Sequence, residues 1–162
     1  MTPQTGGCLC GDIRYSVNAQ PARVTFCHCG ICQRVTGSAY AVEPIFDRAA
    51  LTITKGVPKT YDHLSDGSGK IVHAHFCANC GSGIYYSFER YPDNVGIHAG
   101  GFDNPSWFDW NAKTAKHIFL DNAQHGVTIP AGIPTYAQHA VNRDNSVNAP
   151  TILDAPKTIN RR

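Results

Sequence analysis

The residues with the clearest chemical potential in this chain are its seven cysteines, which fall into three short clusters. Within each cluster the cysteines are separated by one or two residues: Cys8-x-Cys10, Cys27-x-Cys29-x-x-Cys32 and Cys77-x-x-Cys80. Neighbouring thiolates at such spacing can turn toward one metal ion, whereas residues two apart rarely reach relaxed disulfide geometry. The pattern therefore predicts metal binding by thiolates.

The number of cysteines favours a division into two zinc sites. Structural zinc sites commonly have four cysteine ligands, whereas catalytic sites keep three protein ligands and an open position. The cluster Cys27–Cys32 can supply three thiolates from one short loop, which leaves the other four cysteines for a closed site. Spacing alone leaves other groupings open. His28 or His75 can complete a site of three cysteines and one histidine, and both metals are then structural.

Three longer motifs surround these cysteines. They are Gly6-Gly7-Cys8-Leu9-Cys10-Gly11, Cys27-His28-Cys29-Gly30-Ile31-Cys32-Gln33-Arg34 and Phe76-Cys77-Ala78-Asn79-Cys80-Gly81. In this order they resemble the glutathione-dependent formaldehyde-activating enzyme family, which also contains centromere protein V. Weaker similarity continues through residues 100–105, 117–119 and 129–134, so the resemblance extends over residues 6–136. One departure is the stretch 122–126, which lacks an aromatic residue that the resemblance leads us to expect.

The resemblance implies an all-β fold of the β-tent type, in which antiparallel sheets are pinned by zinc and long helices are few or absent. It also implies one structural and one catalytic-type zinc ion per chain, with the ligands Cys8, Cys10, Cys77 and Cys80 for the first and Cys27, Cys29 and Cys32 for the second. The activity that it implies is carbon–sulfur lyase chemistry on glutathione adducts of aldehydes. Some family members are not enzymes, so the alternative hypothesis is a non-catalytic, zinc-stabilised binding module.

A zinc ion with three thiolate ligands has a net negative charge, which weakens its Lewis acidity and favours positioning a substrate thiol over activating a carbonyl. Adding a thiol to an aldehyde also requires proton transfer, and His28 and His98 are the candidate histidines. Glutathione carries carboxylates, and Arg34 is the candidate cation because a guanidinium can bind a carboxylate through two hydrogen bonds. The expected partner is therefore a small thiol such as glutathione.

Short β-strands must position these residues, because alternation of apolar and polar residues recurs along the chain. Ile13, Tyr15 and Val17 alternate with polar residues. Further extended segments are predicted at residues 40–46, 51–54, 58–61, 70–76, 84–88, 95–98 and 117–120. A short helical turn is predicted at 33–36 or at 112–116. We expect one zinc-binding domain over residues 1–140 and a flexible C-terminal tail over residues 141–162.

The composition narrows the class of function. The formal net charge is only +2, and this excess lies in residues 141–162, so the neutral body gives no electrostatic reason to expect binding to nucleic acid or to a membrane. No window approaches the roughly 20 apolar residues that cross a bilayer, and the N-terminus does not read as a signal peptide. We therefore expect a cytoplasmic protein, in which thiols stay reduced or bind metal. The sequence does not indicate the oligomeric state, the particular thiol or the electrophile.

Overall fold

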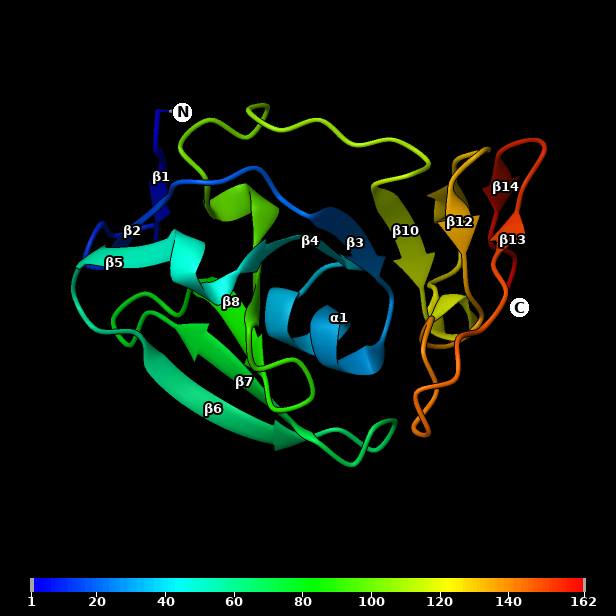
Figure 1. Ribbon diagram of the computed structural model, residues 1–162, viewed down its shortest axis with the longest axis horizontal. Helices are drawn as coiled ribbons and strands as arrows, with labels where there is room; N and C mark the ends of the chain where they lie inside the picture. Colours follow the sequence, from blue (N-terminus) through cyan, green and yellow to red (C-terminus); the bar gives the residue numbers. More distant parts are fainter. Residues whose placement is uncertain (1, 162) are drawn as a thin grey trace. The chain divides into compact units, whose positions relative to one another are not determined.

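The computed structural model describes residues 2–161, which pack as two compact units (Figure 1). The first unit spans Met1–Arg23 and Glu43–Asp109, and the second spans Val24–Val42 and Trp110–Arg162. Both units are built mainly from β-strands, and residues 2–161 contain a single α-helix. The prediction of an all-β protein with few or no long helices is therefore confirmed.

The first unit holds two sets of antiparallel strands. One is a three-stranded sheet of β1 (Gln4–Gly7), β2 (Arg14–Val17) and β5 (Leu51–Lys55), in that order. The other consists of β4 (Ala41–Asp47), β9 (Asn94–Ile97), β8 (Gly83–Phe88), β7 (Ile71–Phe76) and β6 (Lys59–Leu64), in that order. Short 3-10 helices at Arg48–Ala50 and Ala99–Gly101 follow β4 and β9.

The core of the first unit explains why apolar and polar residues alternate along strands such as β2. On β2 the side chains of Tyr15 and Val17 are buried, whereas Arg14 and Ser16, which alternate with them, are half-buried, as expected for a strand with one face on the core. Apolar side chains from both sets of strands join Tyr15 and Val17 there. They include Ile13, Phe46, Ile84, Val95, Ile97 and Phe102, together with Cys8 and Cys77.

The second unit contains the strands that depart from the predicted antiparallel arrangement. Strand β10 (Ala115–Ile118) pairs in parallel with β3 (Arg23–Cys27) on one side and with β12 (Pro134–Thr135) on the other. Parallel neighbours need a long crossover rather than a tight turn, and β3 and β10 are indeed far apart in the sequence. These two strand pairs are parallel, so the strands of the all-β fold are mixed in direction rather than antiparallel throughout.

The single α-helix, α1 (Gly30–Thr36), follows β3 directly. Its N-cap is Cys29, and it ends at Gly37, whose φ of 63° is the left-handed conformation that terminates many helices. The predicted helical turn at 33–36 lies within α1. The alternative at 112–116 is wrong, because residues from Ala115 onward form β10.

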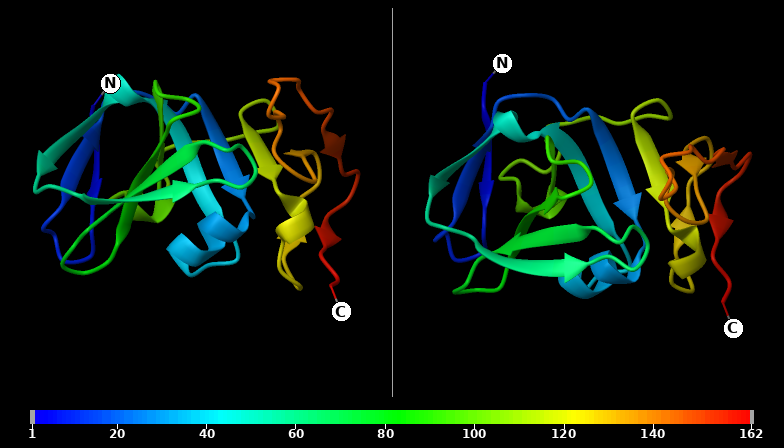
Figure 2. Two further views of the ribbon diagram at one scale, coloured as in Figure 1. Left: turned by 90° about the horizontal axis from the view of Figure 1, so that it is seen from below. Right: turned by 60° about the horizontal axis from the view of Figure 1, so that its bottom comes forward.

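The segment 141–162 contributes strands to the second unit. Strand β13 (Thr151–Ile152) pairs with β12, and β14 (Lys157–Thr158) pairs with β11 (Thr128–Ile129). Figure 2 shows this red segment alongside the yellow and orange part of the chain from two further directions. The domain boundary at residue 140 and the flexibility of residues 141–162 stay predictions. Among the helices of residues 2–161, none is both long enough and apolar enough to cross a membrane.

A glycine in β1 generates a test of this packing. Gly6 pairs with Tyr15 and bridges to Phe102, and a Cβ atom at Gly6 would overlap the carbonyl oxygen of Gly101 and the ring of Tyr15. We expect Gly6→Ala to lower the free energy of unfolding by about 1–3 kcal/mol, the usual cost of overpacking. Urea unfolding of the metal-loaded protein measures this. Gly100→Ala is the matched control because a Cβ atom there meets nothing within 4 Å, and equal destabilisation by both changes would contradict the packing.

Candidate metal centres

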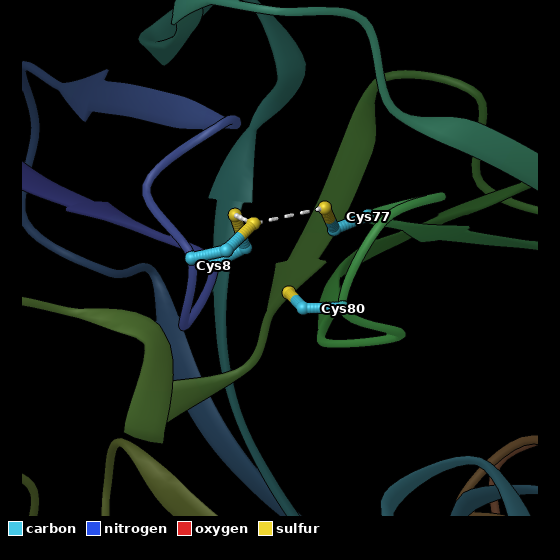
Figure 3. Close-up of side chains that lie close together, drawn as sticks. Cys8, Cys77 and Cys80 are labelled. Atoms are coloured by element: carbon cyan, nitrogen blue, oxygen red, sulfur yellow. Dashed lines mark hydrogen bonds between the residues drawn. The ribbon is translucent and has the colours of Figure 1, made fainter.

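The first unit brings four cysteines from two loops into one cluster. Cys8 and Cys10 lie in the loop between β1 and β2, and Cys77 and Cys80 lie in the loop between β7 and β8. Their sulfur atoms all lie within 4.8 Å of one another. In Figure 3 the side chains of Cys8, Cys77 and Cys80 point toward a common centre. This is the grouping that was inferred for the structural zinc site.

The distances within this four-cysteine cluster suit a tetrahedral zinc ion. Zinc–sulfur bonds of about 2.3 Å in a tetrahedron separate the sulfur atoms by about 3.8 Å. The Sγ atoms of Cys8 and Cys10 are 3.5 Å apart, and those of Cys10 and Cys77 are 3.7 Å apart. None of the seven cysteines is joined in a disulfide. The donor set therefore fits zinc.

The two loops that carry this cluster share one backbone geometry. The N–H of Gly11 donates to the carbonyl oxygen of Cys8 at 3.1 Å, and the N–H of Gly81 donates to that of Cys77 at 2.9 Å. Both glycines have φ near 75°, in the region that side chains disfavour. These tight turns fold each cysteine pair back on itself. The Ser82 hydroxyl lies 3.2 Å from the Cys80 sulfur, and this hydrogen bond is the largest of several that lower the pKa of Cys80 to about 5.

The second unit holds a three-cysteine cluster, formed by the end of β3 and the start of α1. The sulfur atoms of Cys27, Cys29 and Cys32 lie within 4.8 Å of one another. Cys27 and Cys32 are buried and Cys29 is half-buried. The backbone N–H of Cys32 donates to the Cys29 sulfur at 3.4 Å. Hydrogen bonds from the thiols of Cys27 and Cys32 lower the pKa of Cys29 to about 3, so Cys29 is a thiolate at neutral pH.

The side chains of His28 and His75 belong to neither cluster. His28 is fully buried, and its Nε2 lies 3.1 Å from Nδ1 of His117. His75 lies between Thr60 and Ser87, at 3.0 and 2.9 Å. The alternative grouping, in which one of these histidines completes a closed site, therefore has no support in the geometry.

The two candidate catalytic histidines have similar environments but lie in different units. Burial lowers the pKa of both His28 and His98 to about 4, so both are neutral at pH 7. Each also has an enclosed ring nitrogen, Nδ1 of His28 and Nε2 of His98, without a hydrogen-bond partner among residues 2–161. His98 lies against the ring of Tyr86, with ring centres 4.8 Å apart. Their role in proton transfer stays a prediction.

A shallow pocket of about 600 Å³ adjoins α1, and we call it the α1 pocket. Its lining residues come from α1 and the following turn and from residues 120–126, a loop that begins with the short 3-10 helix Leu120–Asn122. They are Gly30, Gln33, Arg34, Gly37, Ser38, Ala39, Asn122 and Gln124. Arg34, the predicted carboxylate-binding residue, is the single cation among them, and its Nη1 donates to the carbonyl oxygen of Gly30 at 3.1 Å.

One residue of the site that sequence reasoning missed is Gln33. Its Nε2 donates to the carbonyl oxygens of His28 at 2.6 Å and Asn122 at 2.9 Å, and its Oε1 accepts from Nε2 of Gln124 at 2.9 Å. Gln33 thus ties the backbone of the three-cysteine loop to the 120–126 loop. Its position directly after Cys32 is the one signal that the sequence offered.

Residues 3–122 of the chain match the family described as glutathione-dependent formaldehyde-activating enzyme. The chain belongs to this family. The structure also resembles a crystal structure of a protein from Rhodobacter sphaeroides, with a TM-score of 0.51 and 21% sequence identity. The similarity covers 65% of this chain and 98% of the other, and at this identity it supports the fold alone. A comparison with curated proteins found no match.

Family membership gives the two clusters a context. It identifies the chain with a group of glutathione-related enzymes, and the clusters are suited to hold metal ions within such an enzyme.

The two clusters should respond differently to loss of a ligand. With zinc supplied under anaerobic conditions, we expect about two zinc ions per chain by elemental analysis. Cys80→Ala should give insoluble or molten protein, since structural zinc supplies on the order of 10 kcal/mol of folding free energy in zinc-finger peptides. Cys29→Ala should stay folded and retain about one zinc ion.

Circular dichroism and metal content of both variants check this difference. A folded, metal-free parent protein would exclude zinc sites altogether. Equal unfolding of the two variants would contradict the division into a structural and a catalytic-type site.

Proposed function

We propose that this protein is a zinc-dependent carbon–sulfur lyase that acts on adducts between aldehydes and glutathione or a related thiol. The observation that carries the proposal is the three-cysteine cluster, whose sulfur atoms lie within 4.8 Å of one another next to a pocket that contains one arginine. Membership of a family of glutathione-related enzymes supports the same chemistry.

In this proposal Cys27, Cys29 and Cys32 hold a zinc ion. When bound, the metal supplies an open coordination position that keeps a substrate thiol ionised at neutral pH. With only three protein ligands from one short loop, this site holds metal less firmly than the four-cysteine cluster. Cys27 and Cys32 are buried, so Cys29, which is half-buried, is the residue of this cluster that is most open to solvent.

The α1 pocket orients the thiol-bearing molecule. Arg34 donates one N–H to Gly30, and a guanidinium has five N–H donors, so its remaining donors are available to a carboxylate. Arg34 lines the α1 pocket together with Gly30, which directly follows Cys29, so a thiol at the three-cysteine cluster and a carboxylate at Arg34 can belong to one small molecule. Glutathione, a thiol with carboxylates, meets both requirements.

The reaction requires one proton transfer in each direction. When the thiol adds to the aldehyde, a C–S bond forms between the thiol sulfur and the aldehyde carbon, and the thiol proton is transferred to the carbonyl oxygen. In the reverse reaction the adduct hydroxyl loses its proton as the C–S bond breaks. A neutral imidazole can accept that proton, and we propose His28 or His98 for this role.

The tautomer of His28 decides whether it can act. If Nε2 of His28 donates to Nδ1 of His117, the Nδ1 of His28 carries a lone pair and is a proton acceptor. The opposite tautomer places a proton on that atom and removes this function. The stacked pair of His28 and His117 rings, with centres 5.4 Å apart, keeps either arrangement rigid.

Thiol binding provides the first test. In cobalt-substituted protein, reduced glutathione should perturb the sulfur-to-metal charge-transfer band, and S-methylglutathione, which cannot present a thiolate, should bind much more weakly. Arg34→Ala should weaken glutathione binding by about 1.5–3 kcal/mol, the usual contribution of a hydrogen bond to a charged group. Arg48→Ala removes an exposed cation outside the α1 pocket and is the matched control. No response to any thiol at millimolar concentration would favour the non-catalytic binding module.

Catalysis is tested separately from binding. The parent protein should accelerate the approach to equilibrium between formaldehyde, glutathione and their adduct without changing the final composition, and Cys29→Ala should abolish the acceleration. Nuclear magnetic resonance of the adduct methylene group measures both the rate of approach to equilibrium and the final composition. The control is the same reaction without protein, because the uncatalysed addition is appreciable. Thiol binding combined with an unchanged rate would show that the electrophile is not formaldehyde.

A further inference from the structure

The α1 pocket has a polar wall that the proposed reaction does not use. The arginine at its edge accounts for a carboxylate, but two glutamine side chains, Gln33 and Gln124, also line it. The remaining lining side chains are small or absent, apart from Asn122. Hydrogen-bonding groups in such a pocket usually fix the orientation and identity of a ligand, so the two glutamines are candidates for selecting the thiol.

The two glutamines differ in whether their side-chain amides have hydrogen-bonding atoms still available to a ligand. Gln33 donates to two backbone carbonyl oxygens and accepts from Gln124, so its amide is committed to the wall itself. Gln124 donates to Gln33 through Nε2, while its own Oε1 accepts no hydrogen bond within residues 2–161. Gln124 is also solvent-exposed, so a ligand in the pocket can reach this oxygen.

The loop that carries Gln124 is held by the residues that follow β14. The N–H of Gly126 donates to the carbonyl oxygen of Ile159 at 2.9 Å, and Nη2 of Arg161 donates to that of Leu120 at 2.7 Å. The 120–126 loop is therefore tied at both of its ends to residues 157–161. The Gln124 side chain itself is held by its hydrogen bond to Gln33, and a side chain held in this way loses less conformational freedom on binding a ligand.

We infer that Gln124 selects thiols that carry an amide N–H, by accepting that N–H at its Oε1 while Arg34 binds the carboxylate. The selected class is the peptidyl thiols, in which an acylated amino group lies next to the thiol-bearing carbon chain. The residue lies just beyond the part of the chain that matches the family. The inference rests on the proposed function, because it requires a thiol at the three-cysteine cluster.

A matched pair of small thiols tests this inference directly. N-acetylcysteine and 3-mercaptopropionate both carry a thiol and a carboxylate, and they differ by one acetamido group. Calorimetry with the zinc-loaded full chain should show that Gln124→Leu weakens binding of N-acetylcysteine and glutathione by about three- to tenfold, the effect of losing one neutral hydrogen bond. Binding of 3-mercaptopropionate should change by less than about twofold.

The second thiol also separates recognition from damage to the site. In Gln124→Leu, loss of the contact with Gln33 could instead distort the three-cysteine loop. Such distortion would weaken the binding of all three thiols by the same factor, and that result would overturn the inference. Gln138→Leu is the control, since Gln138 is exposed and its amide donates to Asp121 outside the pocket lining; it should leave all three affinities unchanged.

The remaining outcomes distinguish this inference from the proposed function. If the parent protein binds glutathione and Gln124→Leu binds it equally well, the inference is wrong and the proposed function stands. If the parent protein binds none of the three thiols, the proposed function is wrong, and the inference fails with it.

Discussion

Repulsion between crowded thiolates is the constraint on which both units depend. Within a cluster whose sulfur atoms lie within 4.8 Å of one another, a first thiolate can accept hydrogen bonds from the thiols beside it, but further ionisation is opposed because like charges at this distance raise one another's pKa. In the four-cysteine cluster the pKa of Cys80 is lowered to about 5. For Cys10, a backbone hydrogen bond from Asp12 lowers the pKa, but desolvation and the neighbouring thiols outweigh it and raise the pKa to about 12. A divalent cation removes this conflict by favouring every thiolate at once. The arrangement of strands that assembles such clusters is therefore suited to hold a metal ion.

The same constraint has different consequences in the two units. In the first, the cysteines come from loops that are far apart in the sequence, and Cys8 and Cys77 are themselves part of the apolar core. In the second, all three cysteines come from one turn and the helix that it begins. A cluster that closes a long stretch of chain stabilises the fold, whereas a local cluster beside a pocket is suited to exchange its remaining position with a ligand.

The sequence predicted the parts of this structure whose signals are local. Cysteine spacing indicated both clusters, and alternation indicated strands such as β2 and β8, because burial on one face of a strand leaves a period of two. It did not indicate β3, where Val24, Thr25, Phe26 and Cys27 are all buried and no alternation remains. The strands β11 to β14 have two residues each, too few to show a pattern. Gln33 and Gln124 were missed for a related reason: a glutamine gains its role only from partners that the fold brings near, such as the carbonyl oxygens of His28 and Asn122.

The parallel pairing of β3 with β10 has a consequence for how this site can change. Cys27 is paired with Ile118, so both strands end at the same edge of the sheet, one leading into the three-cysteine loop and the other into the 120–126 loop. The three cysteines and the pocket wall formed by the 120–126 loop thus leave this common edge on separate segments of the chain. Insertions, deletions or grafts in the 120–126 loop can reshape the pocket without altering any of the cysteines. For the function proposed above, this separation makes the 120–126 loop the natural place to redesign thiol preference while the three cysteines stay unchanged.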